Sequence, residues 1–207
     1  PDEAVVSPVA ADSLRRLSGS LPLVCVISGR RVSDLRAKVG LDGPVYVGNH
    51  GGERYQAGTL VVSPGMAEHE GRITGLLDTL QRRVDDPGII WENKKYSAAV
   101  HFRATNDPLS VKLALAEAVS IVDEADGLQL FWGKMLLEIR ILNGVHKGDA
   151  LRELAQEYRL DAAVFLGDDM TDLDAMKMLR TMREQDGLRG ISAVVIDKST
   201  SQELLCE

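Results

Sequence analysis

Apolar and polar residues alternate along the first quarter of the chain in the rhythm of a parallel α/β sheet. Amphipathic segments at 10–17 and 32–39 accompany short apolar runs at 21–27 and 45–47. Helical segments that alternate with short buried strands are typical of parallel sheets, where each helix connects two neighbouring strands. The pattern therefore predicts that these residues belong to an α/β domain.

The pattern changes after residue 51. Two strand-like segments, 54–56 and 59–62, are separated by Ala57 and Gly58. Such a short link containing glycine favours a hairpin over a crossover connection. A different substructure is therefore expected to begin near this point.

An αββαββ succession follows the hairpin. Its six segments are 67–84, 89–91, 96–103, 108–125, 128–132 and 136–141. Pro108 comes directly after Asp107, and this pair suits the first helical position and the N-cap of the second helix. We predict an inserted α+β cap domain at residues 63–143, with a small sheet of antiparallel hairpins.

The β/α rhythm then returns. A helix is predicted at 147–158, a buried strand at 163–166, a helix at 172–182 and a strand at 191–196, with a polar loop at 184–190. The core domain is thus predicted to be split by the cap, into residues 1–62 and 144–207.

The amino-acid composition excludes several classes of binding partner. The 31 acidic and 24 basic residues give a net charge of −7 without long runs, so no surface for nucleic acid or an anionic membrane is expected. Cys25 and Cys206 do not form a disulfide framework, and no apolar run is long enough to span a bilayer. These features predict a soluble cytoplasmic protein.

Three carboxylates follow the predicted strand at 163–166. Asp168 and Asp169 come directly after Gly167, and Asp172 follows closely. Ligands of open α/β sheets bind at the carboxyl ends of strands, and neighbouring carboxylates there suit a hard cation such as Mg²⁺. The alternative is a solvated turn with a helix cap, which we favour for Asp172, whereas for Asp168 we favour the ion.

A serine and a lysine complete a possible phosphoryl-transfer site. Ser28 follows the apolar run 21–27, where its hydroxyl and the next amides could bind phosphate oxygens, although such a serine is commonly just an N-cap. Lys147 starts a predicted helix, where the macrodipole disfavours a cation, so a nearby anion is expected. A solvated surface lysine is the alternative.

Three motifs in this order resemble those of haloacid-dehalogenase phosphatases. They are SGR at 28–30, HKG at 146–148 and GDDMTD at 167–172. A receiver domain also combines acids, Ser or Thr and Lys, but its acid pair precedes the other two. The resemblance implies a Rossmann-like parallel-sheet core with the inserted cap.

The resemblance also implies roles for individual residues. Ser28 would hold the transferring phosphoryl group, and Lys147 would neutralise the phosphate and the nucleophile. Asp168 would bind Mg²⁺, and Asp169 would assist the ion or orient Lys147. The family nucleophile is the first aspartate of a DxDGT motif, which does not occur in this sequence. We expect it upstream of Pro1, on a central strand whose absence leaves an open sheet with exposed apolar edges.

Four further segments are similar to trehalose-6-phosphate phosphatases in particular. They are PDEAVVSP at 1–8, VGNHGGE at 47–53, ENKKYSAAVHFR at 92–103 and LLEIR at 136–140. By this resemblance the residues that contact the substrate on the core side are Arg30, Asn49, His50 and Gly51. The residues expected to bind the sugar hydroxyls are Glu92, Lys94, Arg103 and Glu138. Alternatively, these last four are charges on an exposed sheet face, paired across strands.

The predicted function is Mg²⁺-dependent hydrolysis of trehalose 6-phosphate through an aspartyl-phosphate, with a small sugar phosphate as the partner. Two alternatives stay open. One is an inactive homologue that still binds sugar phosphates. The other is a phosphatase of a different sugar phosphate, such as that of sucrose or mannosyl-glycerate.

Overall fold

The computed structural model describes residues 5–122, 127–142 and 144–196. The chain divides into two compact units. The first, termed the core unit, comprises Pro1–Val61 and Val145–Glu207. The second, termed the cap unit, is Val62–Gly144 and is inserted in the sequence of the first.

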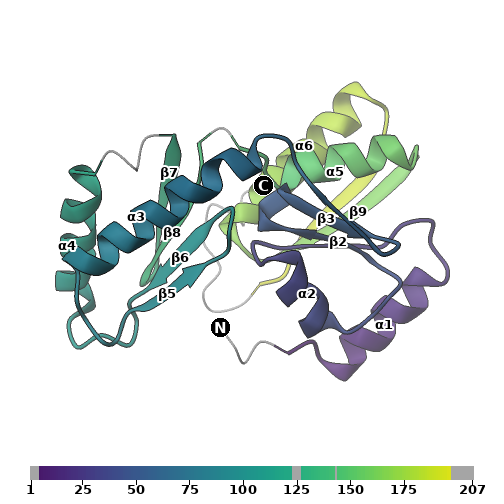
Figure 1. Cartoon of the computed structure of the whole chain (residues 1–207). Helices are drawn as coiled ribbons and strands as arrows, with labels where there is room; N and C mark the ends of the chain where they lie inside the picture. The colour runs from purple at the N-terminus through teal and green to yellow at the C-terminus, as the bar shows by residue number, and fades with distance from the viewer. Residues whose placement is uncertain (1–4, 123–126, 143, 197–207) are drawn as a thin grey trace. The chain divides into compact units, whose positions relative to one another are not determined.

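The core unit alternates helices and strands (Figure 1). Its elements in chain order are α1 (Pro8–Ser18), β1 (Cys25–Ile27), α2 (Val32–Val39), β2 (Val45–Gly48), η1 (Asn49–Gly51), β3 (Glu53–Gln56), β4 (Thr59–Val62), α5 (Lys147–Glu157), β9 (Ala162–Gly167), η4 (Met170–Asp172), α6 (Leu173–Gln185) and β10 (Arg189–Val194). The predicted α/β fold class is confirmed.

The strands of the core unit form two separate sheets among the described residues. One has the order β1-β2-β3-β4, in which β1 and β2 are parallel and β2 and β3 antiparallel. The other is the parallel pair β10-β9. The predicted hairpin joins β3 and β4, and Ala57 and Gly58 have φ of 46° and 86°, as the primed turns of tight hairpins require.

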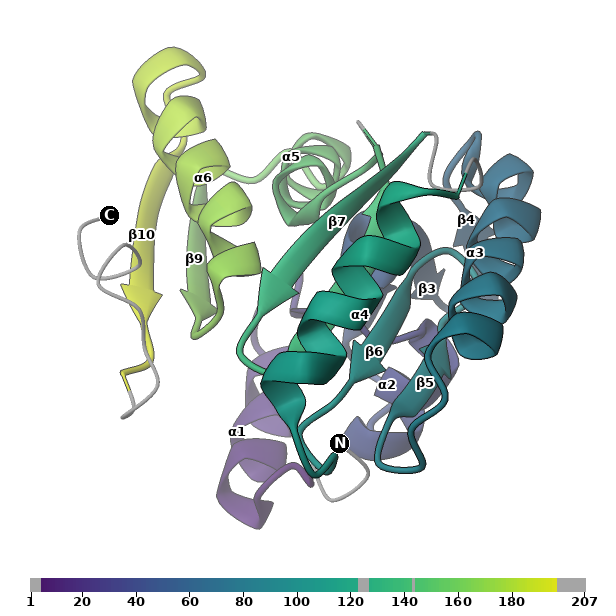
Figure 2. The ribbon, with the colours of Figure 1, turned by 90° about the vertical axis from the view of Figure 1, so that its left-hand side faces the viewer.

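Helices cover these sheets unevenly. Ala150 and Leu154 of α5 pack on Val45 and Val47 of β2, and α6 lies on one face of β9 and β10 (Figure 2). The outward side chains of β9 are exposed instead, Val164 by 69%. In place of the predicted single open sheet, the described residues thus form two separate sheets, with exposed apolar side chains on β9.

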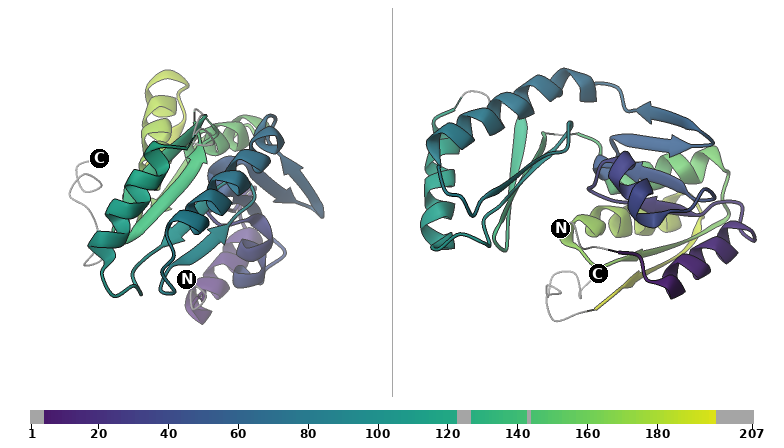
Figure 3. Two further views of the ribbon diagram at one scale, coloured as in Figure 1. Left: turned by 60° about the vertical axis from the view of Figure 1, so that its left-hand side comes forward. Right: turned by 60° about the horizontal axis from the view of Figure 1, so that its bottom comes forward.

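The cap unit contains the predicted αββαββ succession. Its elements are η2 (Met66–His69), α3 (Glu70–Arg83), β5 (Ile90–Asn93), β6 (Ala98–His101), α4 (Pro108–Ser120), β7 (Leu128–Gly133) and β8 (Leu136–Ile141). The strands form one antiparallel sheet in the order β5-β6-β8-β7. Both long helices lie on the same side of this sheet (Figure 3).

The cap unit has an apolar core of its own. Ile73, Leu76 and Leu80 recur at helical spacing on α3 and pack with Leu115 of α4 and Leu137 of β8. Both helices lie on the same face of the sheet because their apolar side chains are buried together against it. Asp107 caps α4 as predicted, since its Oδ1 accepts a hydrogen bond of 3.1 Å from the Ser110 amide.

Several predicted boundaries were wrong. β6 is only four residues long, because Lys95 before it has a positive φ of 74° and the chain turns again after it. α6 continues to Gln185 and β10 already begins at Arg189, so little of the predicted loop 184–190 remains. Part of the predicted helix 108–125 lies outside the described residues. No described helix combines the length and apolarity that a membrane span requires.

Candidate active site

The candidate residues of the core unit gather at strand ends and a helix start. Ser28 directly follows β1, Asp168 and Asp169 follow β9, and Lys147 is the first residue of α5. The carboxyl ends of parallel strands are the usual ligand-binding edge of an open α/β sheet. The fold therefore brings the SGR and GDDMTD motifs to strand ends of the kind that bind ligands, and the HKG motif to the start of α5.

Ser28 lies in a loop that is tied to the end of β2. Its amide donates to the Val47 carbonyl at 2.9 Å, and its carbonyl accepts from the His50 amide at 3.0 Å. Its hydroxyl oxygen accepts a hydrogen bond of 3.2 Å from the Arg30 amide. The Arg30 guanidinium pairs with Asp34 on α2 at 2.8 Å. The loop is thus fixed by backbone contacts, and the hydroxyl stays at the strand end.

The simple N-cap interpretation of Ser28 is wrong. Arg31 occupies the N-cap position of α2 and makes no side-chain cap, while the amide of Val32 donates to Glu53 Oε2 at 2.7 Å. Glu53 is buried, with 5% of its surface exposed. Glu53 was not predicted from the sequence, because a single glutamate at the start of a strand carries no signal of a distant helix cap.

The turn at η1 lies next to both the SGR and the HKG motif. Asn49 and His50 are both buried within the core unit. A Cβ on Gly29 would lie 2.5 Å from His50 Nε2, and one on Gly51 would lie 2.9 Å from the His146 carbonyl oxygen. Side chains at these glycines would push the motifs apart. Gly51 also has a φ of +124°, which other residues rarely adopt.

The anion predicted beside Lys147 is Asp172, and not Asp169. Lys147 Nζ lies 2.6 Å from Asp172 Oδ1, and only 7% of each side chain is exposed. The other oxygen of Asp172 accepts hydrogen bonds of 3.0 Å from the amides of Asp168 and Asp169. The predicted role of Asp172 as a helix cap is therefore wrong, since its side chain makes no cap on α6.

Asp169 instead caps the short turn that leads back to Asp172. Its Oδ1 accepts a hydrogen bond of 3.3 Å from the Thr171 amide. Gly167 permits this fold of the chain, because a Cβ there would lie 2.5 Å from the Cβ of Asp172. The spacing of the GDDMTD motif thus places the carboxylate of Asp172 beside Lys147.

Asp168 is the acid that faces solvent. Its side chain is exposed and makes no hydrogen bond or ion pair with any described residue. No group of three or more His, Cys, Asp or Glu side chains that could hold a metal occurs in the described part of the chain. Asp168 could supply one oxygen to a Mg²⁺ ion, which commonly takes one or two carboxylates and completes its shell with water and phosphate.

The cap unit places two predicted sugar-binding acids in one row. Glu92 on β5 and Glu138 on β8 both pair with Ala99 of β6, one from each side. Glu92 Oε2 lies 3.8 Å from Lys94 Nζ, and Glu138 Oε2 lies 2.6 Å from Arg140 Nη2. Both pairs join residues two positions apart and are partly buried, but Glu92 Oε2 also lies 3.4 Å from His101 Nε2 on the neighbouring strand β6, so the predicted pairing across strands occurs for Glu92. Arg103 lies beyond β6 and is exposed.

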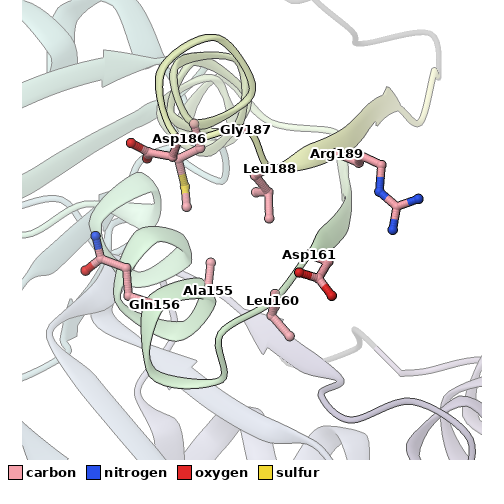
Figure 4. Close-up of a pocket in the computed structure, with 9 residues that line it drawn as sticks. Ala155, Gln156, Leu160, Asp161, Asp186, Gly187, Leu188 and Arg189 are labelled. Carbon is pink, nitrogen blue, oxygen red and sulfur yellow. The ribbon is translucent and has the colours of Figure 1, made fainter.

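A hollow elsewhere in the core unit has a volume of about 450 Å³ (Figure 4). Its walls are Ala155, Gln156, Leu160, Asp161, Met182, Asp186, Gly187, Leu188 and Arg189. These residues lie where β9 and β10 begin, whereas Asp168 follows the end of β9. The hollow is therefore separate from the candidate site.

Comparison with known proteins shows which family this chain resembles. Residues 1–204 match the family model described as trehalose-phosphatase. The trehalose-phosphate phosphatase of Mycobacterium avium (strain 104) is 31% identical over 194 residues, which cover 87% of this chain and 47% of that protein. The chain thus spans about half the length of this relative.

Solved structures share the fold. A trehalose-6-phosphate phosphatase related protein superposes with a TM-score of 0.73 at 24% identity, covering 97% of this chain and 81% of that one. The C-terminal domain of the C. albicans trehalose-6-phosphate phosphatase has a TM-score of 0.74 at 19% identity, covering 97% and 79%. The predicted haloacid-dehalogenase fold and the family resemblance are both confirmed, and the chain belongs to the trehalose-phosphatase family.

Proposed function

We propose that this chain supplies the phosphate-binding and sugar-binding parts of an enzyme that hydrolyses trehalose 6-phosphate to trehalose and phosphate. The buried pair of Lys147 and Asp172 carries the proposal, in a chain that belongs to this family. A lysine that starts a helix and is held by a buried carboxylate suits the binding of a transferring phosphoryl group. Catalysis of phosphoryl transfer consists mainly of such positioning and charge stabilisation.

Each core residue has a separate task in this proposal. Lys147 neutralises charge on the phosphoryl oxygens, and Asp172 fixes the direction of its ammonium group. Ser28 donates its hydroxyl proton to a phosphoryl oxygen, since the Ser28 oxygen already accepts from the Arg30 amide and its own proton stays available. The three groups together orient the phosphate before the bond breaks.

We further propose that Asp168 holds Mg²⁺, with Asp169 as a second acid beside it. The exposed, unpaired carboxylate of Asp168 fits this role, and its amide is fixed by Asp172. When bound, the ion neutralises charge that develops on the phosphate. Asp169 also caps the following turn, so its position is fixed as well.

The nucleophile in this proposal is an aspartate of a DxDGT motif on polypeptide outside these 207 residues. It would attack phosphorus to form an aspartyl-phosphate and release trehalose, and water would then hydrolyse the aspartyl-phosphate. The separation of the sheets supports this idea, because β1 pairs with β2 and β9 with β10, while β1 and β9 do not pair. A parallel strand between them would carry its carboxyl end to the same edge as Ser28 and Asp168. We place this reaction in the cytoplasm, since two cysteines are too few for the disulfide framework of a secreted protein.

The test is release of phosphate by the protein expressed from its whole gene. We expect Mg²⁺-dependent release from trehalose 6-phosphate, faster than from sucrose 6-phosphate, and loss of the activity with EDTA. Asp168→Asn should lower kcat by about a hundredfold or more, as the loss of one charge-stabilising group commonly does. Asp161→Asn, an exposed acid at the other end of β9, serves as the matched control.

Absence of release from trehalose 6-phosphate would contradict the proposed reaction. Equal rates for the parent and Asp168→Asn would exclude the role of Asp168 in holding the ion. Faster turnover of another sugar phosphate would keep the chemistry but change the substrate.

A further inference from the structure

Helix α4 exposes apolar side chains on the side that points away from the apolar core of the cap unit. Leu109 is 68% exposed and Leu113 64%, and Ala116 is exposed as well. Figure 2 looks onto α4 from the side away from the cap sheet. The exposed residues of the neighbouring helix α3 are instead small or polar, namely Gly71, Arg72, Thr74, Asp78, Gln81, Arg82 and Arg83. A helix that is apolar on all sides is usually buried on all sides, so the outer side of α4 has the composition of a contact surface.

The exposed positions form one line along α4, which we term the seam. The seam consists of Leu109, Leu113, Ala116 and Ser120. Their spacing of four, three and four residues is that of the contact positions in a two-stranded coiled coil. With about 3.6 residues per turn, the seam lies opposite the residues of α4 that pack in the cap core, which are Val111, Leu115, Ala118 and Val119. Ser120 suits a contact, because its hydroxyl already donates to the Glu117 carbonyl at 2.7 Å.

Two charged residues, Lys112 and Glu117, flank the seam on opposite sides. Both are exposed, and α4 contains no other charged residue. Neither has an opposite charge three or four positions away on the helix, where an ion pair within α4 would form. The Lys112 ammonium lies 5.6 Å from the centroid of the Trp132 ring. In a parallel pair of helices, flanking residues five positions apart meet across the seam. Two copies of α4 therefore have complementary charges.

We propose that α4 is the docking surface for a second copy of this protein, with the two α4 helices side by side and parallel. The seam residues of each copy pack on the same residues of the other copy. Lys112 of each copy pairs with Glu117 of the other, so two ion pairs flank the apolar contact. A single patch that contacts itself in this way gives a dimer with two-fold symmetry.

The flanking charges select the parallel arrangement. In an antiparallel pair the two Lys112 side chains would lie on one side of the seam and the two Glu117 side chains on the other, so like charges would be neighbours. One helix of 13 residues from each copy takes part. Interfaces that bury less than about 1,200 Å² in total are typically weak, so we expect a dimer that dissociates on dilution.

Charge reversal tests this pairing in the protein expressed from its whole gene. Lys112→Glu or Glu117→Lys alone puts like charges across the seam, and sedimentation equilibrium should show a dimer Kd at least about tenfold above that of the parent. An equal mixture of the two variants should associate like the parent, because each flanking contact again joins opposite charges. Arg83→Glu is the matched control, since it reverses an exposed charge on α3 and should leave the Kd unchanged.

A cysteine cross-link locates the contact on α4. In a background whose other exposed cysteines are replaced by Ser, Ala116→Cys places two thiols opposite each other in a parallel seam, within reach of a disulfide. Mild oxidation should then give a covalent dimer at least about tenfold faster than with Ser110→Cys. Ser110 is exposed on the same helix but lies outside the seam. All these substitutions are at exposed positions, and thermal unfolding checks that each variant is folded.

A parent protein that stays monomeric up to about 1 mM would overturn the proposal. Equal dissociation constants for the parent and the two single charge variants would overturn it as well, and so would a mixture that associates no better than either variant alone. Equally fast cross-linking through residues 110 and 116 would show that the seam is not the contact. These measurements do not involve release of phosphate, so the proposed hydrolysis stands or fails separately.

Discussion

The ion pair of Lys147 and Asp172 is the most constrained contact of the candidate site. Both side chains are almost fully buried, and the second oxygen of Asp172 accepts two amide hydrogen bonds. A buried charge is tolerated only where its partner and hydrogen bonds compensate for lost hydration. The pair therefore fixes both the lysine and the loop that carries Asp168.

Removal of one partner should be costly. Asp172→Asn leaves the Lys147 ammonium group buried without its counter-charge, and we expect the free energy of unfolding to fall by about 3–5 kcal/mol. Urea unfolding of the chain measures this change. Asp161→Asn removes an exposed acid from the same unit and should alter stability by less than about 0.5 kcal/mol. Equal stability of the two variants would mean that the pair is not an effective buried contact.

The sequence predicted an anion beside Lys147 and named Asp169 as an acid that could orient it, whereas Asp172 is the acid that pairs with it. Asp172 follows Asp168 by four residues just before a helix, where an aspartate is typically an N-cap. Only the short turn at Met170–Asp172 directs its carboxylate back to the amides of Asp168 and Asp169. Local spacing cannot reveal this reversal, because a helix cap and a returned carboxylate use the same residue type at the same place.

At the scale of elements, β1 is a short strand that carries the half-buried thiol of Cys25. Burial raises the pKa of Cys25 to about 12 from its ordinary value of 9.0, although the charge of Arg54 partly opposes the shift. Cys25 packs in the apolar cluster that contains Val45 and Leu154. The thiol therefore stays protonated in the native chain at neutral pH.

Alkylation measures this burial. In a Cys206→Ser background, iodoacetamide at pH 8 should modify native Cys25 at least about a hundredfold more slowly than the unfolded chain, because only the thiolate reacts. The unfolded thiol loses its proton near pH 9, whereas the native thiol keeps it until about pH 12. The contribution of Cys25 to stability is thus complete below pH 9 and falls as the pH rises above it. Similar rates in both states would show that β1 is open to solvent.

At the scale of the whole molecule, each unit has its own apolar interior. The cluster around Leu115 consists of residues 73–141, whereas the clusters around Tyr46, Val47 and Phe165 contain only core residues. Local opening of a protein follows such cooperative units. A defect in one interior should therefore leave the other largely protected.

Leu115→Ala tests this independence. Leu115 is fully buried in the cap unit, and its truncation should cost about 2–5 kcal/mol there. Hydrogen exchange should accelerate at the amides of β6 and β8 far more than at those of β2 and β9. Leu113→Ala on the same helix is the control, since Leu113 is 64% exposed. Equal acceleration in both units would indicate a single cooperative structure.

The sequence by itself determined the order of elements, the αββαββ cap and the family, because hydrophobic periodicity and short motifs are local properties of a chain. It also predicted the N-cap at Asp107 and a carboxylate beside Lys147. The tertiary structure decided which acid holds Lys147, that Glu53 caps α2, and that Arg140 holds Glu138. The contacts of Lys147 with Asp172 and of Val32 with Glu53 join residues 21 or more positions apart. The contact of Arg140 with Glu138 joins neighbours on β8, but the burial of both side chains depends on the rest of the cap unit. Which side chains become partners in these contacts depends on tertiary packing, and residue spacing along the chain does not reveal it.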